Sequence, residues 1–357
     1  MLLKKSLRKP AAEITHYKGL LLPGLVNAHC HLELSLFINK IERNTGLLSF
    51  LKEVSTLNRE PEKDVVQEQA KIADAQMYAN GISVVGDISN NMDTVETKIE
   101  SPIAYHTFVE CICISAENLS TRLSHYSNVA EEFSNRDLRS SLGLHAPYTC
   151  CPELYEAVSQ KTSLLSIHNQ ESVEENIFFQ NKSGPFVDFL KSFNFEKENI
   201  LRSSSLNSSF LNSERLLEEV SEKIYVHNTF TSQNDIENAS DNVWWCFCPK
   251  ANLYIENSLP NLEIFKDQED RLLIGTDSLA SNNELNLLGE LIVLQNKFPS
   301  ISMERMFKWV TSNGARALSY DDQYGSFELG KTPGIVQIEN FDCGSRKLLD
   351  TKVKRLF

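Results

Sequence analysis

The chain has 357 residues, of which 41% are hydrophobic and 23% are charged. This is the composition of a folded globular protein with a full-sized core, and it excludes an intrinsically disordered chain. Asp and Glu number 48 against 35 Lys and Arg, so the formal net charge of −13 argues against a general binder of nucleic acids or anionic membranes.

The sequence contains no sign of a membrane or secretory segment. No apolar run approaches the roughly 18 residues that a membrane-spanning helix needs. The first residues, MLLKKSLRKPAAE, are basic but lack an apolar segment behind them, so we expect no signal peptide. Eight cysteines are too few for a disulfide-stapled scaffold of this length, and most lie in apolar stretches. We therefore expect buried free thiols and a cytoplasmic protein.

Short apolar runs alternate with longer helical patterns along most of the chain, which is typical of βα units and a parallel sheet. Helices are predicted over residues such as 64–80, 151–160 and 212–222. Eight strands, each followed by a helix, predict an α/β protein with a (β/α)8 TIM barrel. The predicted strands are 24–30, 81–89, 103–113, 141–146, 163–169, 223–228, 243–248 and 271–277.

Two segments lie outside this alternation. Residues 1–22 and 331–357 are predicted to form a small β-sandwich from both chain ends, and residues 23–330 form the barrel. The connection over 176–211 is long and rich in phenylalanine. A connection of this kind is either a lid over the barrel or a flexible excursion.

Histidine or aspartate stands at the end of four predicted strands. His29 and His31 close the first strand, where residues two apart face the same side and can ligate one metal ion. His168 and His227 close the fifth and sixth strands, and Asp277 closes the eighth. A lone histidine there is usually a core residue and a lone aspartate is usually a helix cap. The joint pattern favours a metal site at the carboxyl ends of the strands.

Imidazoles combined with one carboxylate suit a borderline divalent ion, with Zn²⁺ favoured and Fe²⁺ or Mn²⁺ as alternatives. An open position on such an ion generates hydroxide from water near neutral pH. Glu171, three residues after His168, is placed to accept and donate protons. Because five candidates compete for four ligand positions, one histidine is left as an electrostatic partner of the hydroxide.

At this point the motifs resemble the amidohydrolase superfamily, in particular its mononuclear branch of triazine hydrolases and cytosine deaminase-like enzymes. The matching phrases run in the family's order and are PGLVNAHCHLE (23–33), GLHAPYTC (143–150), SIHNQES (166–172), VHNTFTS (226–232), CPKANLYI (248–255), IGTDSLASNNELNLLGEL (274–291) and LGKTPGIVQI (329–338). The resemblance implies His29, His31, His168 and Asp277 as metal ligands and Glu171, His227 and Asp277 as catalytic residues. In the mononuclear members, the histidine matched by His227 orients the hydroxide and does not bind the metal.

The resemblance also implies a single metal ion, because no lysine in SLGLHAPY matches the bridging lysine of binuclear relatives. A different zinc deaminase pattern, HxE followed by PCxxC, is only half present. His31-Leu32-Glu33 fits HxE, but the chain has no PCxxC, which excludes that other fold.

The phrases HCHLELSLF (29–37) and ESVEENIFFQNKSGPFVDFL (171–190) are similar to those of aminodeoxyfutalosine deaminases. This likeness implies a metal-dependent hydrolytic deaminase of an adenine-type nucleoside, in which hydroxide attacks ring C6 and ammonia leaves. The Phe-rich connection would cover the aromatic base. The substrate contacts implied by the matching phrases are Glu33, His145, Asn252 and Ser278. Lys250 departs from the family's phrase, where relatives often have a small or different polar residue, and it is a candidate partner for a carboxylate or phosphate of the substrate. For Glu33 the alternative is a satisfied carboxylate at the barrel rim, and for Lys250 it is a solvated surface lysine.

Two other functions remain open at this point. The same scaffold could hydrolyse a C–Cl, C–S or cyclic amide bond, because the same residues serve both reactions. A non-catalytic barrel that only binds a ligand is disfavoured, since every candidate ligand and catalytic residue is present. By family analogy we expect a homodimer that acts on a small molecule and binds neither nucleic acid nor membrane.

Overall fold

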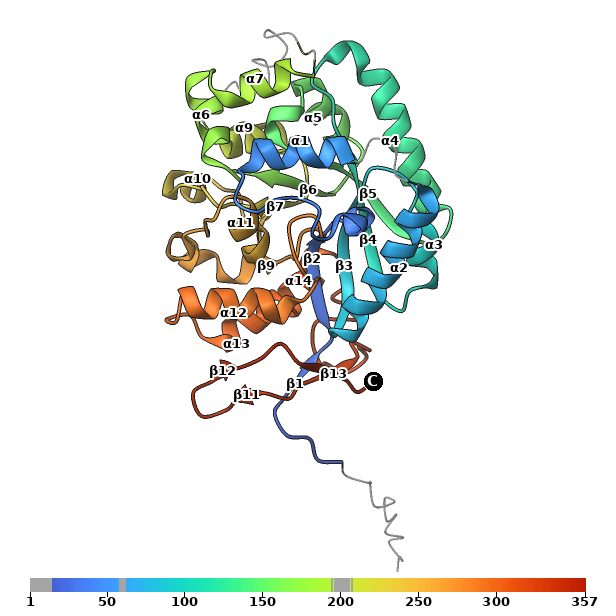
Figure 1. Cartoon of the computed structure of the whole chain (residues 1–357), viewed down its shortest axis with the longest axis vertical. Coiled ribbons are helices and arrows are strands. Elements are labelled where there is room, and N and C mark those ends of the chain that lie inside the picture. The colour runs from blue at the N-terminus through green and yellow to red at the C-terminus, as the bar shows by residue number, and fades with distance from the viewer. Residues whose placement is uncertain (1–14, 58–61, 194, 196–205, 207) are drawn as a thin grey trace, which may run out of the picture.

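Eight parallel strands form one sheet in chain order, β2-β3-β4-β5-β6-β7-β8-β9, with helices around it (Figure 1). This computed structural model describes residues 15–57, 62–193, 195, 206 and 208–357. The predicted TIM-barrel class and its eight strands are confirmed. The strands are β2 (Leu25–Cys30), β3 (Ile82–Ser89), β4 (Ala104–Cys111), β5 (Arg139–Leu144), β6 (Leu164–Asn169), β7 (Glu222–His227), β8 (Val243–Phe247) and β9 (Leu272–Ile274).

The barrel closes between its first and last strands. The backbone N–H groups of Thr276 and Asp277 both donate to the carbonyl of His29, over 3.0 and 3.2 Å. This close approach requires glycine at position 275, because a Cβ there would lie 2.7 Å from the Cβ of His29 and 2.8 Å from its carbonyl oxygen. The closure therefore holds Asp277 beside His29.

Gly275→Ala is expected to destabilise the fold by about 1–3 kcal/mol, because the added methyl group must push β9 away from β2. The same displacement moves Asp277 away from His29, so metal content should fall as well. Thermal unfolding and metal analysis of the purified variant check both effects. Gly344→Ala is the control, because Gly344 is exposed and the nearest heavy atom there is an oxygen of the partly exposed Asp342 side chain. Equal melting temperature and metal content in wild type and Gly275→Ala would contradict the prediction.

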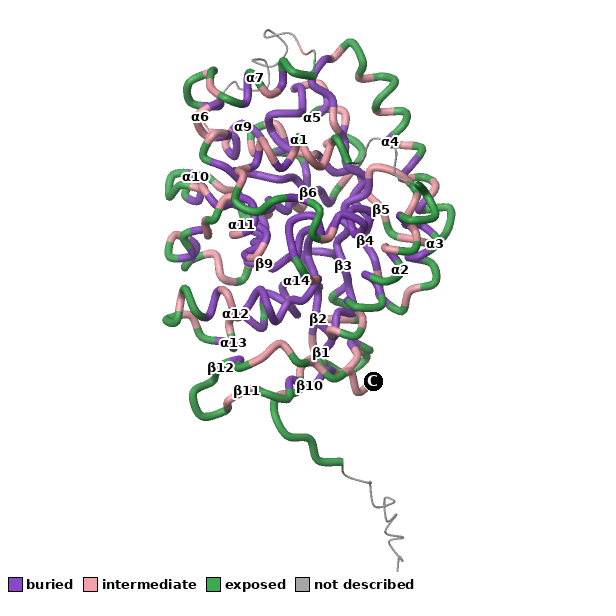
Figure 2. The backbone as a smooth tube through the Cα atoms, in the orientation of Figure 1, coloured by how far each residue is buried: buried purple, intermediate pink, exposed green. Residues whose placement is uncertain are grey.

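Both faces of the barrel sheet are buried, which explains why its strands are nearly continuous apolar runs (Figure 2). Side chains from opposite strands, among them Val84, Phe108, Ile224 and Leu273, fill the barrel interior. A second, larger cluster fills the space between the sheet and the surrounding helices. The interior is thus a packed core, and any open site must lie at one end of the barrel.

The helices have the bounds α1 (Leu47–Leu57), α2 (Lys63–Ala79), α3 (Val95–Glu100), α4 (Leu119–Ser134), α5 (Pro152–Ser159), α6 (Val173–Asn181), α7 (Pro185–Lys191), α9 (Ser209–Leu216), α10 (Gln233–Glu237), α11 (Pro249–Ile255), α12 (Leu287–Lys297), α13 (Met303–Trp309) and α14 (Ser312–Ala317). Short 3₁₀ helices are η1 (Leu32–Phe37), η2 (Ala116–Asn118), η3 (Pro147–Thr149) and η4 (Leu262–Arg271). The helix predicted over 212–222 lies a few residues earlier in the structure, as α9. Ser208 caps α9 by accepting a hydrogen bond from the Leu211 N–H, so this helix starts earlier, and it ends before the turn into β7.

The two chain ends meet in a small antiparallel sheet, drawn below the barrel in Figure 1. Its strands are β1 (Leu20–Pro23), β10 (Ile335–Ile338) and β13 (Val353–Arg355), and a hairpin of β11 (Phe341–Asp342) and β12 (Lys347–Leu348) follows β10. Residues 1–14 of the predicted N-terminal segment lie outside the described residues. The domain boundaries at 22/23 and 330/331 stay a prediction.

Two further features concern the expectations for membrane segments and for cysteines. Within the described residues, no helix is both long and apolar enough to cross a membrane. Seven of the eight cysteines are buried and all eight are free thiols.

Candidate active site

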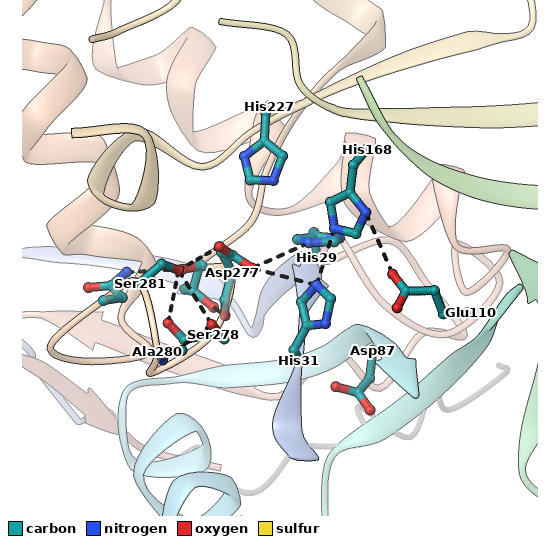
Figure 3. Close-up of polar contacts among 12 residues, drawn as sticks. His29, His31, Asp87, Glu110, His168, His227, Asp277, Ser278, Ala280 and Ser281 are labelled. Atoms are coloured by element: carbon teal, nitrogen blue, oxygen red, sulfur yellow. Dashed lines mark hydrogen bonds and ion pairs between the residues drawn. The ribbon is translucent and has the colours of Figure 1, made fainter. Parts of the chain in front are cut away.

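Three histidines and one aspartate converge at the carboxyl ends of the barrel strands (Figure 3). Donor nitrogens of His29, His31 and His168 all lie within 4.8 Å of one another. The Nε2 atoms of His31 and His168 are 3.2 Å apart. Asp277 Oδ1 lies 3.6 Å from the Nε2 atoms of both His29 and His31. The four residues predicted as metal ligands therefore surround one small volume.

The spacing and hydrogen bonding of this group fit a divalent ion. Ligands about 2.0–2.1 Å from a tetrahedral Zn²⁺ stand roughly 3.3–3.4 Å apart, close to the separation of His31 and His168. His29 is fully buried, and neither of its ring nitrogens has a hydrogen-bond partner among the described residues. His168 donates from Nδ1 to the carbonyl of His145 over 2.7 Å, which leaves Nε2 as a free acceptor. Buried nitrogens of this kind are costly unless a ligand occupies the space between them.

Burial keeps the imidazoles of His31 and His168 in the neutral form that binds metals. Burial first, and then the neighbouring imidazole of His29, lowers the pKa of both His31 and His168. Burial by itself would raise the pKa of Asp277, but the imidazoles that face its carboxylate lower that pKa overall. Ser281 also donates its hydroxyl to Asp277 Oδ2 over 2.5 Å. The site therefore offers neutral nitrogens and an ionised carboxylate.

Local departures from regular strand geometry turn the side chains of the candidate ligands toward the site. Val26 and Ala28 face the barrel interior, so strict alternation would point His29 outward. The register between β2 and β3 shifts between Asn27 and Cys30, and such a bulge redirects the side chains that follow it. His227 and Asp277 have left-handed backbones, with φ of 75° and 55°. Such conformations cost of order 1–3 kcal/mol each in residues other than glycine and gather at functional sites.

Glu171 and His227 lie together beside the ligand group. Glu171 Oε2 is 3.5 Å from His227 Nε2, and both residues line the same pocket. Burial, followed by repulsion from Asp277 and Glu175, raises the pKa of Glu171 well above its usual range. Burial lowers the pKa of His227 to about 4. A carboxyl group with a raised pKa beside a neutral imidazole is suited to moving protons.

Hydrogen bonds to a second carboxylate, that of Glu175, fix the turn that carries Glu171. Glu175 accepts hydrogen bonds from the backbone N–H groups of Gln170 and Glu171, over 3.0 and 3.3 Å. Ser172 caps the start of α6 by accepting from the Glu175 N–H. Glu171 is thus presented from a fixed helix start, and its own carboxyl group faces the pocket.

A pocket of about 390 Å³ opens above this group, within the usual range for small-molecule sites. Its polar end contains His31, Glu110, His168, Glu171, His227 and Asp277. Most of the apolar lining comes from α1 and from α7 and the residues after it, and α1 also contributes the polar Ser55. The other apolar lining residues are Leu34, Ile112, Ile114 and Tyr148. Of the predicted Phe-rich connection, Phe178, Phe179 and Phe186 are fully buried, whereas Phe189, Phe193 and Phe195 line the pocket.

The structure separates the five predicted substrate contacts into two groups. His145 and Ser278 line the pocket. Glu33, Lys250 and Asn252 are not among its lining residues: Glu33 accepts hydrogen bonds from Asn90, and Lys250 Nζ lies 3.0 Å from Glu284. The Asn252 side chain lies behind His227, with Oδ1 3.4 Å from His227 Nδ1. A substrate contact for these three residues stays a prediction.

Glu110 is a pocket residue that the sequence analysis missed. It follows the interior residue Phe108 by two positions on β4, so both side chains point into the barrel. Glu110 Oε2 accepts from the Asn90 amide over 3.0 Å, and buried Oε1 has no hydrogen-bond partner among the described residues. The sequence feature that could have indicated Glu110 is its position as a single charged residue inside the apolar run 103–113.

Comparisons with known proteins agree with this geometry. Residues 20–350 match the model of the amidohydrolase family. The chain is 27% identical over 327 residues to an adenosine deaminase of Helicobacter pylori, covering 88% of this chain and 77% of that protein. It is also 27% identical over 352 residues to an aminodeoxyfutalosine deaminase of Nitratiruptor sp., covering 92% and 82%.

A crystal structure of Helicobacter pylori aminofutalosine deaminase in complex with methylthio-coformycin superposes with a TM-score of 0.73 at 25% identity. The match covers 88% of this chain and 78% of that one. The family match spans nearly the whole chain, including every strand of the barrel and all the predicted ligands. The chain therefore belongs to the amidohydrolase family and is a hydrolytic enzyme.

Proposed function

We propose that the chain is a metal-dependent hydrolytic deaminase of an aminated heterocycle, most favourably an adenine-type nucleoside, from which it releases ammonia. The observation that carries this proposal is the convergence of three imidazoles, Asp277 and the Glu171–His227 pair at one end of a pocket of small-molecule size. The relatives named as adenosine and aminodeoxyfutalosine deaminases support the same reaction.

His29, His31, His168 and Asp277 would hold one divalent ion, and Zn²⁺ is favoured because nitrogen ligands predominate. Such an ion lowers the pKa of a water and so supplies the nucleophile at neutral pH. The remaining chemistry belongs to the chain. Asp277, fixed by Ser281 and by barrel closure, would hold its carboxylate beside the metal, where it can accept a hydrogen bond from the attacking water.

Glu171 would carry the proton. It accepts one proton from the attacking water and passes it to the ring nitrogen. It then takes the second proton of that water, from the hydroxyl group now on the ring carbon, and delivers it to the departing amine. The products are the carbonyl form of the heterocycle and ammonia, so one water is consumed for each C–N bond broken. The neutral His227 imidazole lies 3.5 Å from Glu171 and would orient the water for attack. His145 and Ser278, on the pocket wall, would contact the substrate.

A direct assay tests the reaction. Zn²⁺- or Fe²⁺-loaded protein should release ammonia from one or more adenine nucleosides in a panel with adenosine, aminodeoxyfutalosine, S-adenosylhomocysteine, 5′-methylthioadenosine, guanine and cytosine. Mass spectrometry should show the product one mass unit heavier, as replacement of –NH₂ by –OH requires. Protein stripped with a chelator is the control. Silence across the panel with metal bound would contradict the proposal and favour hydrolysis of a C–Cl, C–S or cyclic amide bond.

Three finer assignments complete the proposal. A cytoplasmic location agrees with the free thiols. A homodimer is expected by analogy with the family. A single metal ion per chain is expected because no lysine in SLGLHAPY matches the bridging lysine of binuclear relatives. Sedimentation equilibrium and metal analysis of the same preparation would measure the last two together.

A further inference from the structure

The backbone at His31 lies between two regular elements. β2 ends at Cys30 and η1 begins at Leu32, so His31 belongs to neither and has φ of −122° and ψ of 85°. Its ring meets the ligand group through Nε2, which lies 3.2 Å from His168 Nε2 and 3.6 Å from Asp277 Oδ1. A small change in this backbone would turn the ring away from the other ligands, so the residues on either side of His31 must be held.

Asp87, on β3, is bonded to the chain on both sides of His31. The ladder between β2 and β3 ends with the pair Cys30 and Asp87. Beyond it, the Leu32 N–H donates to Asp87 Oδ1 over 2.8 Å. Figure 3 shows Asp87 beside this end of β2. Because Leu32 is fully buried, its N–H would be costly to leave without an acceptor.

A lysine from α3 holds the other oxygen of the Asp87 carboxylate. Lys98 Nζ lies 2.7 Å from Asp87 Oδ2, and both side chains are fully buried. The same ammonium group donates to Thr107 Oγ1 over 2.9 Å and to Ser89 Oγ over 3.1 Å, so each of its three N–H donors has an acceptor. The carboxylate therefore cannot rotate away from Leu32 without breaking a buried ion pair.

Stability alone does not account for this ion pair. Burying two charges costs much of what their attraction returns, and well-packed apolar residues of similar volume often give equal stability. We propose that Asp87, fixed by Lys98, is a positioning residue for the metal site, which holds the backbone around His31 so that Nε2 faces the other ligands. Asp87 acts through the Leu32 N–H and is not itself a ligand. This inference rests on the metal site of the proposed function.

The experiment compares two double variants of the full chain that differ in one oxygen atom. Both members of the pair are replaced together, because a single replacement would leave a buried charge unpaired. Asp87→Asn/Lys98→Met keeps an oxygen that can accept from the Leu32 N–H. Asp87→Leu/Lys98→Met has nearly the same shape without that oxygen. If the leucine variant does not fold, Asp87→Ala/Lys98→Met, which also lacks the oxygen, takes its place.

Two measurements report on the ligand group without any substrate. Competition with a chromophoric chelator gives the Zn²⁺ affinity, and the visible absorption of Co²⁺-loaded protein reports the geometry of the ligands. The asparagine variant should bind Zn²⁺ within about threefold of wild type, and the leucine variant about 10–100-fold more weakly. The Co²⁺ bands should be those of wild type in the asparagine variant and shifted in the leucine variant.

A second buried ion pair provides the matched control. Lys223 Nζ lies 2.7 Å from Glu214 Oε1, and both side chains are largely buried. Lys223 stands near the start of β7, at the end of that strand away from His227. Glu214→Gln/Lys223→Met therefore removes an equivalent pair far from the ligands. It should leave the Zn²⁺ affinity and the Co²⁺ spectrum unchanged.

The outcomes separate this inference from the proposed function. Equal Zn²⁺ affinities in the asparagine and leucine variants overturn the positioning role, whether both are high or both are low. A loss of affinity in the control pair as large as in the leucine variant overturns it as well. The expected order of affinities without ammonia release from any nucleoside supports the positioning role and overturns the deaminase proposal alone. If the wild type binds no Zn²⁺, both are overturned.

Discussion

Glu171→Gln is expected to lower kcat by about 1,000-fold while leaving the bound metal in place. The amide keeps the size and hydrogen bonding of the carboxyl group but cannot accept a proton from water or deliver one to the ring nitrogen and the amine. Because Glu171 is outside the group of three histidines and Asp277, its loss removes no metal ligand. Single-turnover kinetics and metal analysis on the same preparation measure the two effects.

A neighbouring carboxylate provides the matched control. Glu174 lies three residues beyond Glu171 at the start of α6, is partly exposed, and does not line the pocket. Glu174→Gln should therefore retain wild-type turnover and metal content. If Glu171→Gln keeps more than about a tenth of wild-type kcat, the residue is not the main proton carrier and the mechanism proposed above is wrong.

The environment of Glu171 explains why a carboxyl group can serve in this role. Burial and the charges of Asp277 and Glu175 raise its pKa, which brings its proton affinity closer to that of the groups with which it exchanges protons. Glu175 contributes to this electrostatic effect and also holds the turn through two backbone hydrogen bonds. Glu175 thus contributes to both the position and the proton affinity of Glu171.

The sequence predicted the barrel and its candidate ligands because both depend on local order. Buried parallel strands are continuous apolar runs, and the residue after such a run lies at the carboxyl end of the barrel. His168 and Asp277 could be placed by this rule alone. His29 could not be aimed by alternation, since the bulge between Asn27 and Cys30 depends on pairing with β3 and has no signature in the sequence.

Other features depend on contacts between distant segments. Glu110 lies in the middle of an apolar run, and its role as a pocket carboxylate appears only when β4 is placed in the barrel. Lys250 could be set near the site by its motif, but its ion pair with Glu284 depends on how α11 meets the loop before α12. The phenylalanines of 176–211 divide between core and pocket according to how α6 and α7 fold onto α1.

His168→Ala is expected to weaken metal binding by about 100-fold or more. Mutation of a residue that only orients a metal ligand already lowers metal affinity by about 10–100-fold, and this change removes a ligand itself. His168 is held for the role by its Nδ1 hydrogen bond to the His145 carbonyl, which leaves Nε2 facing His31. Both proteins are purified with equal Zn²⁺ and dialysed against a weak chelator. The wild type should retain its metal, whereas His168→Ala should lose it.

His106→Ala is the matched control for this loss. His106 is also a buried histidine on a barrel strand, but it pairs with Ser141 and lies outside the ligand group. Its replacement should lower stability through lost packing and leave the metal content unchanged. Equal metal content in wild type and His168→Ala would rule out His168 as a ligand. Equal loss of metal from His168→Ala and His106→Ala would mean that metal is lost through general destabilisation of the fold. The site geometry requires that only His168→Ala loses metal.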